Sequence, residues 1–298
     1  MKENNDKPLL GKVAVVAGST RGAGRAIAVM LGAAGATVYC TGRSVRGNPS
    51  DIGRTETIDE TAELVTARGG HGIPVRVDHT DEREVRELFE RIAEEQDGRL
   101  DILVNDIWGG EKLIVFDKPS WEQPLANGLL MQDRAVRAHM ITSYYAAPLM
   151  TARRQGLIVE VTDGIGYGFR LNLFYSLAKI SAIHMAEALA EELKPYGVTA
   201  LAVTPGFLRS EQMLDHFGVT EANWQDAIAK DPHYAESETP YLLAQGVAAL
   251  AADPNVAAKA GRTLASWQLS DEYGFVDIDG RKPHWGNYAK KHGFPHAE

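Results

Sequence analysis

The sequence predicts an α/β fold with a single doubly wound parallel sheet of about seven strands and helices on both faces. Two observations carry this prediction. Short β-branched runs alternate with longer amphipathic runs from near the N-terminus to about Trp267, and this repeated strand–helix alternation is typical of parallel sheets. A glycine-rich turn joins the first strand to the first helix, and such sheets bind ligands at the carboxyl ends of their strands.

Strands are expected where β-branched and apolar residues cluster, at Lys12–Ala17, Thr37–Thr41, Ile73–Val77, Asp101–Val104, Leu157–Val161, Val198–Val203 and Arg262–Ala265. Helices are expected where apolar residues recur at helical spacing, at Ala23–Ala34, Thr57–Arg68, Asp81–Glu95, Leu130–Arg153, Phe174–Lys194 and Tyr241–Ala252. Thr80 and Asp81 should cap the third helix, with Glu84 available to reach back. The run Pro195–Gly197 should end the fifth.

The length suits one domain with insertions or two small domains, and the distribution of the motifs favours one. Its core would span about residues 10–267 and its tail about 268–298. Two longer segments, Trp108–Gly128 and Phe207–Pro240, follow strand ends and are either lids over a ligand or surface decoration. The tail is rich in aromatic residues without periodicity, which suggests docking onto its own subunit or onto a partner.

Composition excludes several classes of protein. A net charge of -9 argues against nucleic acid as a partner. The single cysteine, Cys40, excludes an internal disulfide and favours a cytoplasmic protein. The polar start, Met1–Pro8, does not resemble a signal peptide, and no run approaches the ~18 apolar residues of a membrane span. No metal site is expected, because no histidine, cysteine or aspartate cluster has ligand spacing on a predicted helix or strand.

The glycine turn after the first strand reads Gly18-Ser19-Thr20-Arg21-Gly22-Ala23-Gly24. Glycines here allow a tight turn and a close approach of the backbone to a pyrophosphate, which the free N–H groups of the following helix bind. The second strand ends in Arg43 and Ser44 rather than in the acid that reads a ribose 2′-hydroxyl. Arg43 and Ser44 therefore predict a 2′-phosphate and hence NADPH, with Arg21 as a second positive charge. The alternative is that Arg43 only stacks on the adenine.

Tyr175 and Lys179 are four residues apart in a predicted helix and therefore share one face. A lysine charge about 4 Å from the phenol, at an effective dielectric of roughly 20, would favour the phenolate by about 4 kcal/mol. Such a contact would bring the tyrosine pKa from about 10 toward neutral pH, where the phenol can exchange protons. The alternative is a chance pair on a solvated helix face.

Together, Gly18-x-x-x-Gly22-x-Gly24, Asp78, Asn105, Tyr175-x-x-x-Lys179 and Pro205-Gly206 resemble the short-chain dehydrogenases/reductases in order and spacing, over roughly residues 10–267. More particular runs resemble one branch of that family, namely Asp101–Asn105, Gly156–Val159, Asp253–Asn255, Tyr273–Phe275 and Asp279–Arg281. The resemblance implies a Rossmann domain that carries out hydride transfer with an NADP(H) cofactor.

The resemblance also implies a role for each matched residue. Tyr175 would donate a proton to a carbonyl oxygen, and Lys179 would lower its pKa and bind the nicotinamide ribose. Asp78 and Asn105 match positions that hold the adenine and its ribose. The backbone at Pro205, Gly206 and Phe207 would contact the nicotinamide amide, and Ser210 the amide or the pyrophosphate. A homodimer or homotetramer built on the fourth and fifth helices is implied as well.

This chain departs from the family pattern at three places. The serine that normally polarises the carbonyl is missing, and the strand end reads Thr162-Asp163. Thr162 has the right spacing and is the expected donor. Asp163 is the alternative for this place, although an ionised carboxylate there would repel a developing oxyanion. If Asp163 does not take this role, it points elsewhere or binds a basic or hydroxylated substrate. The relay asparagine is missing near Ala135, and the bulky pair Ile107-Trp108 replaces Ala-Gly after the fourth strand.

The expected function is NADPH-dependent reduction of a carbonyl in a medium-sized, fairly apolar small molecule, or oxidation of the corresponding alcohol. Pocket walls are expected at Trp108, Tyr167, Phe169 and Phe207. Two other classes remain open. One is an NADP(H)-binding sensor or scaffold without turnover, and the other is a lyase or epimerase that uses the cofactor without consuming it.

Overall fold

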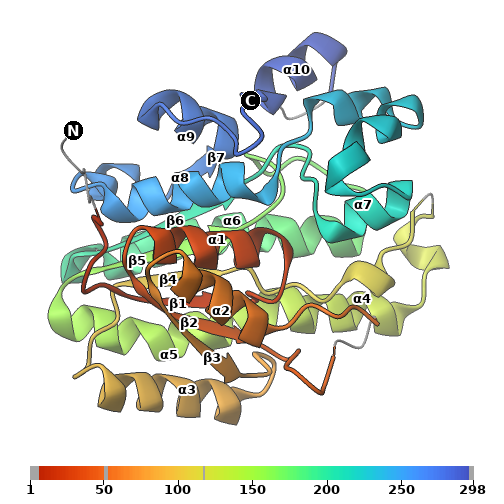
Figure 1. Ribbon diagram of the computed structural model, residues 1–298. Helices are drawn as coiled ribbons and strands as arrows, with labels where there is room; N and C mark the ends of the chain where they lie inside the picture. The colour runs from red at the N-terminus through yellow and green to blue at the C-terminus, as the bar shows by residue number, and fades with distance from the viewer. Residues whose placement is uncertain (1–6, 50–52, 117, 295–298) are drawn as a thin grey trace, which may run out of the picture.

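Seven parallel strands form one sheet in the order β3-β2-β1-β4-β5-β6-β7, as the computed structural model in Figure 1 shows. The structure describes residues 7–49, 53–116 and 118–294. The strands are β1 (Val13–Ala17), β2 (Thr37–Gly42), β3 (His71–Arg76), β4 (Ile102–Asn105), β5 (Gly156–Val161), β6 (Val198–Thr204) and β7 (Thr263–Ala265). The order reverses between β1 and β4, so the carboxyl ends of these two strands flank the switch point where ligands of such sheets bind.

Helices cover both faces of the sheet (Figure 1). One layer holds α1 (Gly22–Ala33), α2 (Ile58–Ala67), α8 (Pro240–Ala252) and α9 (Ser266–Tyr273). The other holds α3 (Glu82–Glu95), α5 (Ala138–Arg153) and α6 (Leu173–Leu193), with α4 (Leu125–Gln132) packed against α6. The layers arise because successive strand residues point to opposite faces. On β1, Ala14 and Val16 join the core under α1 and α8, whereas Val13 and Val15 join the core under α3 and α5.

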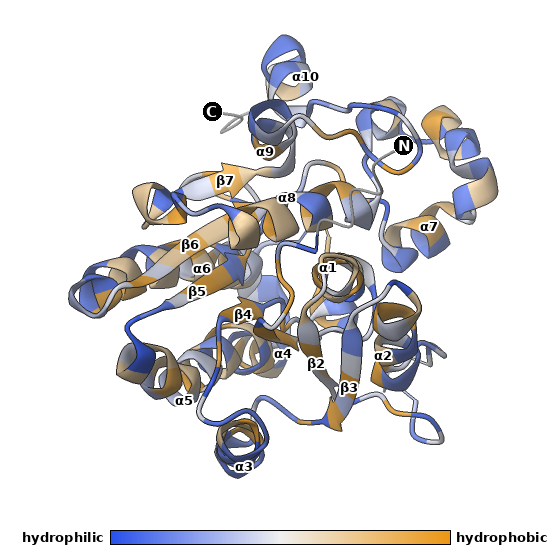
Figure 2. Ribbon diagram, turned by 60° about the vertical axis from the view of Figure 1, so that its left-hand side comes forward, coloured by the Kyte–Doolittle hydropathy of each residue, from blue (hydrophilic) through white to orange (hydrophobic). Residues whose placement is uncertain are grey.

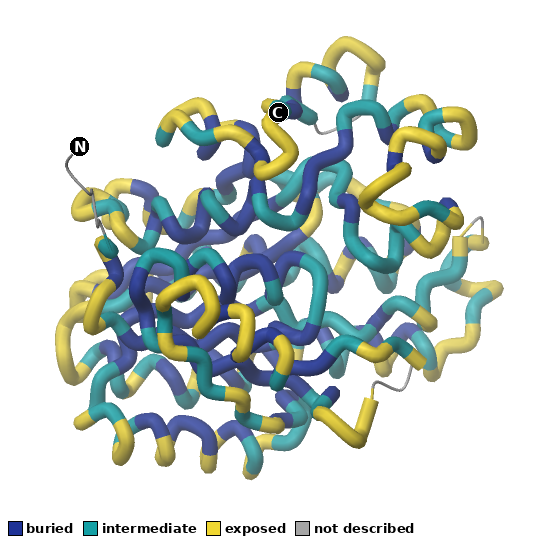
Figure 3. The backbone as a smooth tube through the Cα atoms, in the orientation of Figure 1, coloured by how far each residue is buried: buried dark blue, intermediate teal, exposed yellow. Residues whose placement is uncertain are grey.

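The hydrophobic residues gather on the strands and the inward sides of the helices, and burial follows the same pattern (Figures 2 and 3). The strands β1, β4 and β6 are each buried along their whole length. This is the expected pattern for parallel strands that are covered on both faces. Cys40 is a free thiol that is buried in β2.

The predicted strands all form, and each end lies within two residues of its expected position. Asp81 caps α3 by accepting the N–H groups of Arg83 and Glu84. Glu84 reaches back to the N–H of Asp78 rather than to the cap residue. Past α6, a short turn of 3-10 helix ends at Gly197, whose φ of 71° confirms the predicted stop.

The predicted helix Leu130–Arg153 is the largest correction. It begins earlier, as α4, and then passes through the π-helical segment η3 (Asp133–Arg137) before α5. A π-helical turn inserts an extra residue, which breaks the regular periodicity on which the prediction depended. The segment faces α6, the helix that carries Tyr175 and Lys179.

The two long segments lie beside the carboxyl edge of the sheet. The first holds η1 (Glu111–Leu113) and η2 (Ser120–Glu122), and the second holds α7 (Glu211–Phe217), η5 (Glu221–Ala229) and η6 (Pro232–Glu236). The tail forms α10 (Trp285–His292) and packs on its own chain, with the ring of Trp285 5.7 Å from that of Phe207. These contacts support the proposal that the chain is one domain. Within residues 7–49, 53–116 and 118–294, no helix is long and apolar enough to cross a membrane.

Candidate active site

A cleft of about 1130 Å³ opens at the carboxyl edge of the sheet. Most of the residues predicted for the site line it: Gly18, Thr20, Arg21, Gly22, Ala23, Arg43, Ser44, Asp78, Thr162, Asp163, Tyr175, Lys179, Pro205, Gly206, Phe207 and Ser210. Three predicted residues, Ser19, Gly24 and Asn105, are not among those that line the cleft. Glycine turn, Arg43 and the tyrosine–lysine pair therefore belong to one cavity.

The glycine turn has no room for side chains. A Cβ on Gly18 would lie 2.4 Å from the backbone oxygen of Asp106, and one on Gly24 would lie 2.3 Å from the oxygen of Gly18. Gly24 therefore serves the packing of α1 against the turn rather than contact with a ligand. Ser19 is buried, and both its N–H and its hydroxyl donate to the carbonyl of Thr41.

A carboxylate occupies the anion position of the turn. The N–H of Gly22, at the start of α1, donates to Oε2 of Glu211 at 2.9 Å. Helix N-termini bind anions because their first N–H groups have no partner within the helix and because the helix dipole favours negative charge there. Glu211 comes from α7, so the second predicted lid reaches the point where a pyrophosphate is expected.

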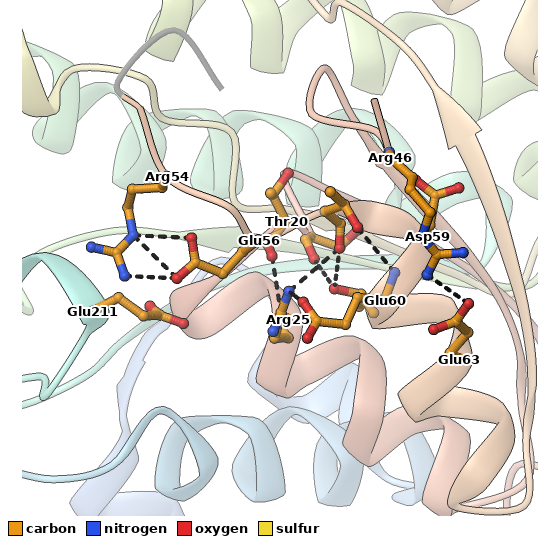
Figure 4. Close-up of polar contacts among 12 residues, drawn as sticks. Thr20, Arg25, Arg46, Arg54, Glu56, Asp59, Glu60, Glu63 and Glu211 are labelled. Atoms are coloured by element: carbon orange, nitrogen blue, oxygen red, sulfur yellow. Dashed lines mark hydrogen bonds and ion pairs between the residues drawn. The ribbon is translucent and has the colours of Figure 1, made fainter. Parts of the chain in front are cut away.

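Ion pairs surround the mouth of the cleft. Arg21 pairs with Glu111 at 2.7 Å, rather than pointing freely toward a 2′-phosphate. Arg54 pairs with Glu56 at 2.6 Å and also contacts Asp215 of α7. Figure 4 shows Arg54 pointing toward Glu56, with Glu211 beside them. The contact between Arg54 and Asp215 connects the segment before α2 to α7.

The end of β2 and the segment after β3 meet on the opposite side of the cleft. Nη1 of Arg43 lies 3.8 Å from Oδ2 of Asp78, and Ser44 is buried beside them. Burial alone would raise the pKa of Asp78, but hydrogen bonds from Thr80 and the charge of Arg43 outweigh it and lower that pKa. Asp78 therefore supplies an ionised acceptor and Arg43 a cation at the place expected for the adenosine end of a dinucleotide.

The start of α6 presents Tyr175 and Lys179 to the cleft. Asn172 caps the helix by accepting the N–H of Tyr175, which fixes the first turn. The phenol of Tyr175 donates to Oδ2 of Asp163 at 2.8 Å. Nζ of Lys179 lies 4.0 Å from the centre of the Trp108 ring and 5.6 Å from that of the Tyr175 ring.

The pKa of Tyr175 moves in the opposite direction from the sequence expectation. Burial and the carboxylate of Asp163 raise it well above its ordinary value, and the charge of Arg170 offsets this only in part. The expectation assumed a lysine charge close to the phenol, whereas Lys179 lies over Trp108 and the close charged neighbour is Asp163. Burial lowers the pKa of Lys179, although Asp163, Asp106 and Glu111 act against that change.

Thr162 and Asp163 face different partners. The hydroxyl of Thr162 donates to the backbone carbonyl of Lys179 at 2.7 Å, so its proton is directed at α6. Asp163 is exposed and lies against the phenol of Tyr175. The arrangement gives the place beside the tyrosine to Asp163, the alternative that the sequence left open, rather than to Thr162.

The side chain of Asn105 is committed to the core. Its Nδ2 donates to Oγ of Ser143 at 2.9 Å and to Oε1 of Glu160 at 2.7 Å. The amide of Asn105 therefore donates within the core, and Asn105 is not among the residues that line the cleft. Glu160 and His139 form a fully buried pair below it, with Nδ1 of His139 2.6 Å from Oε2 of Glu160.

Several residues of the cleft could not be foreseen from the sequence. Glu111, Arg170, Glu211, His233, Trp285 and Phe294 line it. Most lie in segments without regular periodicity, and no motif marks them. The tail's aromatic residues were the one available signal for Trp285 and Phe294. Of the expected walls, Trp108, Phe169 and Phe207 line the cleft, whereas Tyr167 lies outside it and contacts Glu187.

A family model described as short chain dehydrogenase matches residues 12–218. The chain belongs to the short-chain dehydrogenase/reductase family. The family prediction is thereby confirmed, and so is the Rossmann-type sheet. As a member, the chain is an oxidoreductase of the short-chain type, a family that uses NAD(P)(H).

The branch expected from the sequence is also confirmed. The chain is 37% identical over 278 residues to the mouse protein dehydrogenase/reductase SDR family member 1, covering 92% of this chain and 85% of that protein. The human protein of the same name is 36% identical over the same length. A crystal structure of a short chain dehydrogenase from Mycobacterium thermoresistibile superimposes with a TM-score of 0.75 at 24% identity, covering 93% of this chain and 92% of that one, and shows the same fold.

No group of three or more histidine, cysteine, aspartate or glutamate side chains that could hold a metal ion occurs in the part of the chain that the structure describes.

Proposed function

We propose that this short-chain dehydrogenase/reductase transfers hydride between NADP(H) and a medium-sized, fairly apolar small molecule, with the reacting group held at Tyr175. One observation carries the proposal: Tyr175 and Lys179 open into the same cleft as the glycine turn and Arg43. When bound, the cofactor would supply the hydride. The residues of this chain would orient it and hold the proton of the reacting group at the phenol oxygen of Tyr175.

The residues present fit a dinucleotide phosphate. Gly18, Thr20, Arg21 and Gly22 of the turn line the cleft, and the N–H of Gly22 already binds an anion, the Glu211 carboxylate. A pyrophosphate would replace that carboxylate at the helix N-terminus. Arg43 and Ser44 would hold the 2′-phosphate, and Pro205 to Phe207 would face the nicotinamide.

The walls around the tyrosine support an apolar substrate. Trp108, Ile114, Phe207, Met213 and Trp285 line this cleft together. Pockets lined by aromatic and aliphatic side chains with a few convergent polar groups are typical of small-molecule sites. We therefore propose a substrate with an aromatic or aliphatic ring body.

We also propose that the protein is cytoplasmic, which the free buried thiol of Cys40 favours.

Arg43→Ala should lower the affinity for NADPH by about tenfold or more while changing the affinity for NADH by less than about threefold. A hydrogen bond to a charged group contributes about 1.5–3 kcal/mol to binding. NADH has no 2′-phosphate, so its binding does not depend on this contact. Fluorescence titration of the nicotinamide measures both constants. Arg46→Ala is the matched control, because Arg46 is exposed and pairs with Glu63 outside the cleft. An equal loss for both cofactors would mean that Arg43 only stacks on the adenine.

Mixing the protein with NADPH and a panel of apolar aldehydes and ketones tests the function itself. Consumption of NADPH with reduced product supports the proposal. Tight binding without consumption would favour the sensor or scaffold, and conversion of substrate at constant NADPH would favour the lyase or epimerase. These two alternatives are tested because the chain departs from the family's active-site pattern at Asp163 and lacks the relay asparagine.

We further propose a homodimer or homotetramer built on α5 and α6, since members of the family generally form oligomers. Exposed apolar side chains stand on these neighbouring helices, Met140 and Tyr144 on α5 and Leu173 and Leu177 on α6. Such surfaces are typical of protein interfaces. Sedimentation velocity should give at least a dimer, and Leu177→Glu should give a monomer. A monomeric wild-type protein at micromolar concentration would contradict this proposal.

A further inference from the structure

The place beside the catalytic tyrosine is held by a group that can only accept hydrogen bonds. Asp163 accepts the phenol proton of Tyr175 at 2.8 Å and is otherwise open to the cleft. The neighbouring hydroxyl, that of Thr162, donates to the backbone of Lys179 instead. An ionised carboxylate has no proton to give. Two oxygen atoms with acceptor capacity, one from Asp163 and one from Tyr175, therefore face the reacting group of a substrate.

This arrangement suits a neutral carbonyl poorly. Reduction of a carbonyl builds negative charge on its oxygen, and that charge is stabilised by preorganised donors. Here the one phenol proton is directed at Asp163, and burial with the same carboxylate raises the pKa of Tyr175, which makes it a weaker acid. The carboxylate would also repel the developing oxyanion. The reverse reaction has the same difficulty, because the raised pKa keeps the phenol protonated when it must accept a proton.

A cationic electrophile avoids both difficulties, because the carboxylate attracts its charge and its reduction needs no proton donor. We propose that the cleft reduces a protonated cyclic imine, whose N–H group donates to Asp163 and whose positive charge pairs with that carboxylate. This inference rests on the proposed function for the cofactor and the hydride, and it names the substrate class of the same site. A charge-assisted hydrogen bond of this type is about twice as strong as a neutral one.

The step balances without a proton donor. Hydride from NADPH forms a C–H bond at the imine carbon while the C=N π electrons move onto nitrogen. The iminium becomes a neutral amine and NADPH becomes NADP⁺. The nitrogen keeps its hydrogen throughout, so the step does not require Tyr175 to act as an acid.

The other charged groups near the reacting position are already engaged. The two terminal nitrogens of Arg170 donate to the carbonyls of Gly168 at 2.7 Å and Gly166 at 2.5 Å, so the guanidinium lies on the backbone of its own loop. Lys179 lies over the Trp108 ring, and Glu111 is paired with Arg21. Asp106 adds a second carboxyl group on the Lys179 side; burial raises the pKa of Asp106 to about 7.

Aromatic rings supply the remaining contacts. Phe169, Phe207 and Trp285 line the same cleft as Asp163. Aromatic faces attract organic cations, most strongly where water is excluded. A cyclic iminium with a fused ring would present an apolar body to these walls and its charge to Asp163.

The test compares NADPH consumption with dihydroisoquinoline and with tetralone, an imine and a ketone of similar size. We expect kcat/KM to be higher for the imine by about 100-fold, the effect of one preorganised charged contact at a reacting centre. Asp163→Asn should lower the imine value by a similar factor, and Asp163→Ser should raise the ketone value. A second readout needs no turnover: calorimetry of protonated tetrahydroisoquinoline with the NADP⁺ complex should show about tenfold weaker binding in Asp163→Asn.

Asp133→Asn is the matched control, because Asp133 pairs with Arg137 outside the cleft and should leave every value unchanged. The wild-type preference needs no variant, so a variant that fails to fold cannot hide the answer. Ketone turnover above imine turnover in the wild-type protein, with ammonium binding independent of Asp163, overturns this inference alone. NADPH that binds but is consumed with neither substrate class counts against the proposed function instead.

Discussion

Tyr175→Phe is expected to lower kcat for ketone reduction by about 100- to 10,000-fold, the usual contribution of a positioned general acid. The affinity for NADPH should stay within a few fold of wild type, because the phenol oxygen contacts Asp163. Asp163 is exposed, so the change leaves no buried carboxylate without a partner. Steady-state kinetics with a carbonyl substrate and fluorescence titration of NADPH measure the two quantities. For an imine the loss should be much smaller, since no proton is transferred in that hydride step.

Tyr167→Phe is the matched control for this change. Its hydroxyl contacts Glu187 outside the cleft, so both kcat and NADPH affinity should remain at the wild-type values. Ketone turnover that survives in Tyr175→Phe would show that the proton comes from elsewhere, and the assignment of Tyr175 would then be wrong.

His139→Ala is expected to lower the free energy of unfolding by about 3–5 kcal/mol. His139 and Glu160 form a buried pair, with Glu160 fully inaccessible to solvent. Removing one partner leaves the other charge buried and uncompensated, which is the costly way to break such a pair. Urea unfolding followed by circular dichroism measures the difference. Glu160→Gln is the matched control, because it removes the charge but keeps the shape and a hydrogen-bonding group, and it should cost less.

The effect of His139 should also depend on pH. Burial alone would lower the pKa of His139, but the charge and hydrogen bond of Glu160 outweigh it and raise the pKa above its ordinary value of about 6.5. A group whose pKa is raised in the folded state stabilises the fold fully below its unfolded pKa. That contribution is lost as pH rises through the folded value. The difference between wild type and His139→Ala should therefore shrink as pH increases above about 6.5, and a difference that grows would contradict this account.

His79 also contributes to the pH dependence of the wild-type unfolding free energy. The effect of His139 must therefore be read from the difference between the wild type and the variant. Burial, with a smaller contribution from His139, lowers the pKa of His79 to about 3, so its contribution is present above about 6.5 and lost as pH falls. The two histidines thus act in opposite pH windows. Only the difference between the wild type and the His139 variant separates them.

The fold could be predicted because its signals are local. Alternating β-branched and amphipathic runs, the glycine turn and caps such as Asp81 each act over a few residues, and the strand ends lie where those signals place them. The π-helical turn at Asp133–Arg137 could not be predicted, since it disturbs periodicity without a sequence signature of its own.

The site could be predicted only as far as its motifs extend. The glycine turn, Tyr175 and Lys179 line one cleft, and their resemblance to the family motifs had implied that they act on one cofactor. The contacts that decide the electrostatics arise from residues far apart in the chain. Glu211 reaches Gly22 across 189 positions, and the direction of the Thr162 hydroxyl depends on α6. The expected effect of Lys179 on Tyr175 failed for the same reason, because Trp108 and Asp163 come from other loops.

In the proposed reaction, hydride moves between a nicotinamide held by the glycine turn and a substrate held at Tyr175 and Asp163. The most direct test uses NADPH that carries deuterium at the transferred position, with the imine and the ketone as acceptors and mass spectrometry of the products. We expect one deuterium on the former C=N or C=O carbon, with an equal amount of NADP⁺ formed. Bound but unconsumed NADPH, or product without deuterium, would contradict it.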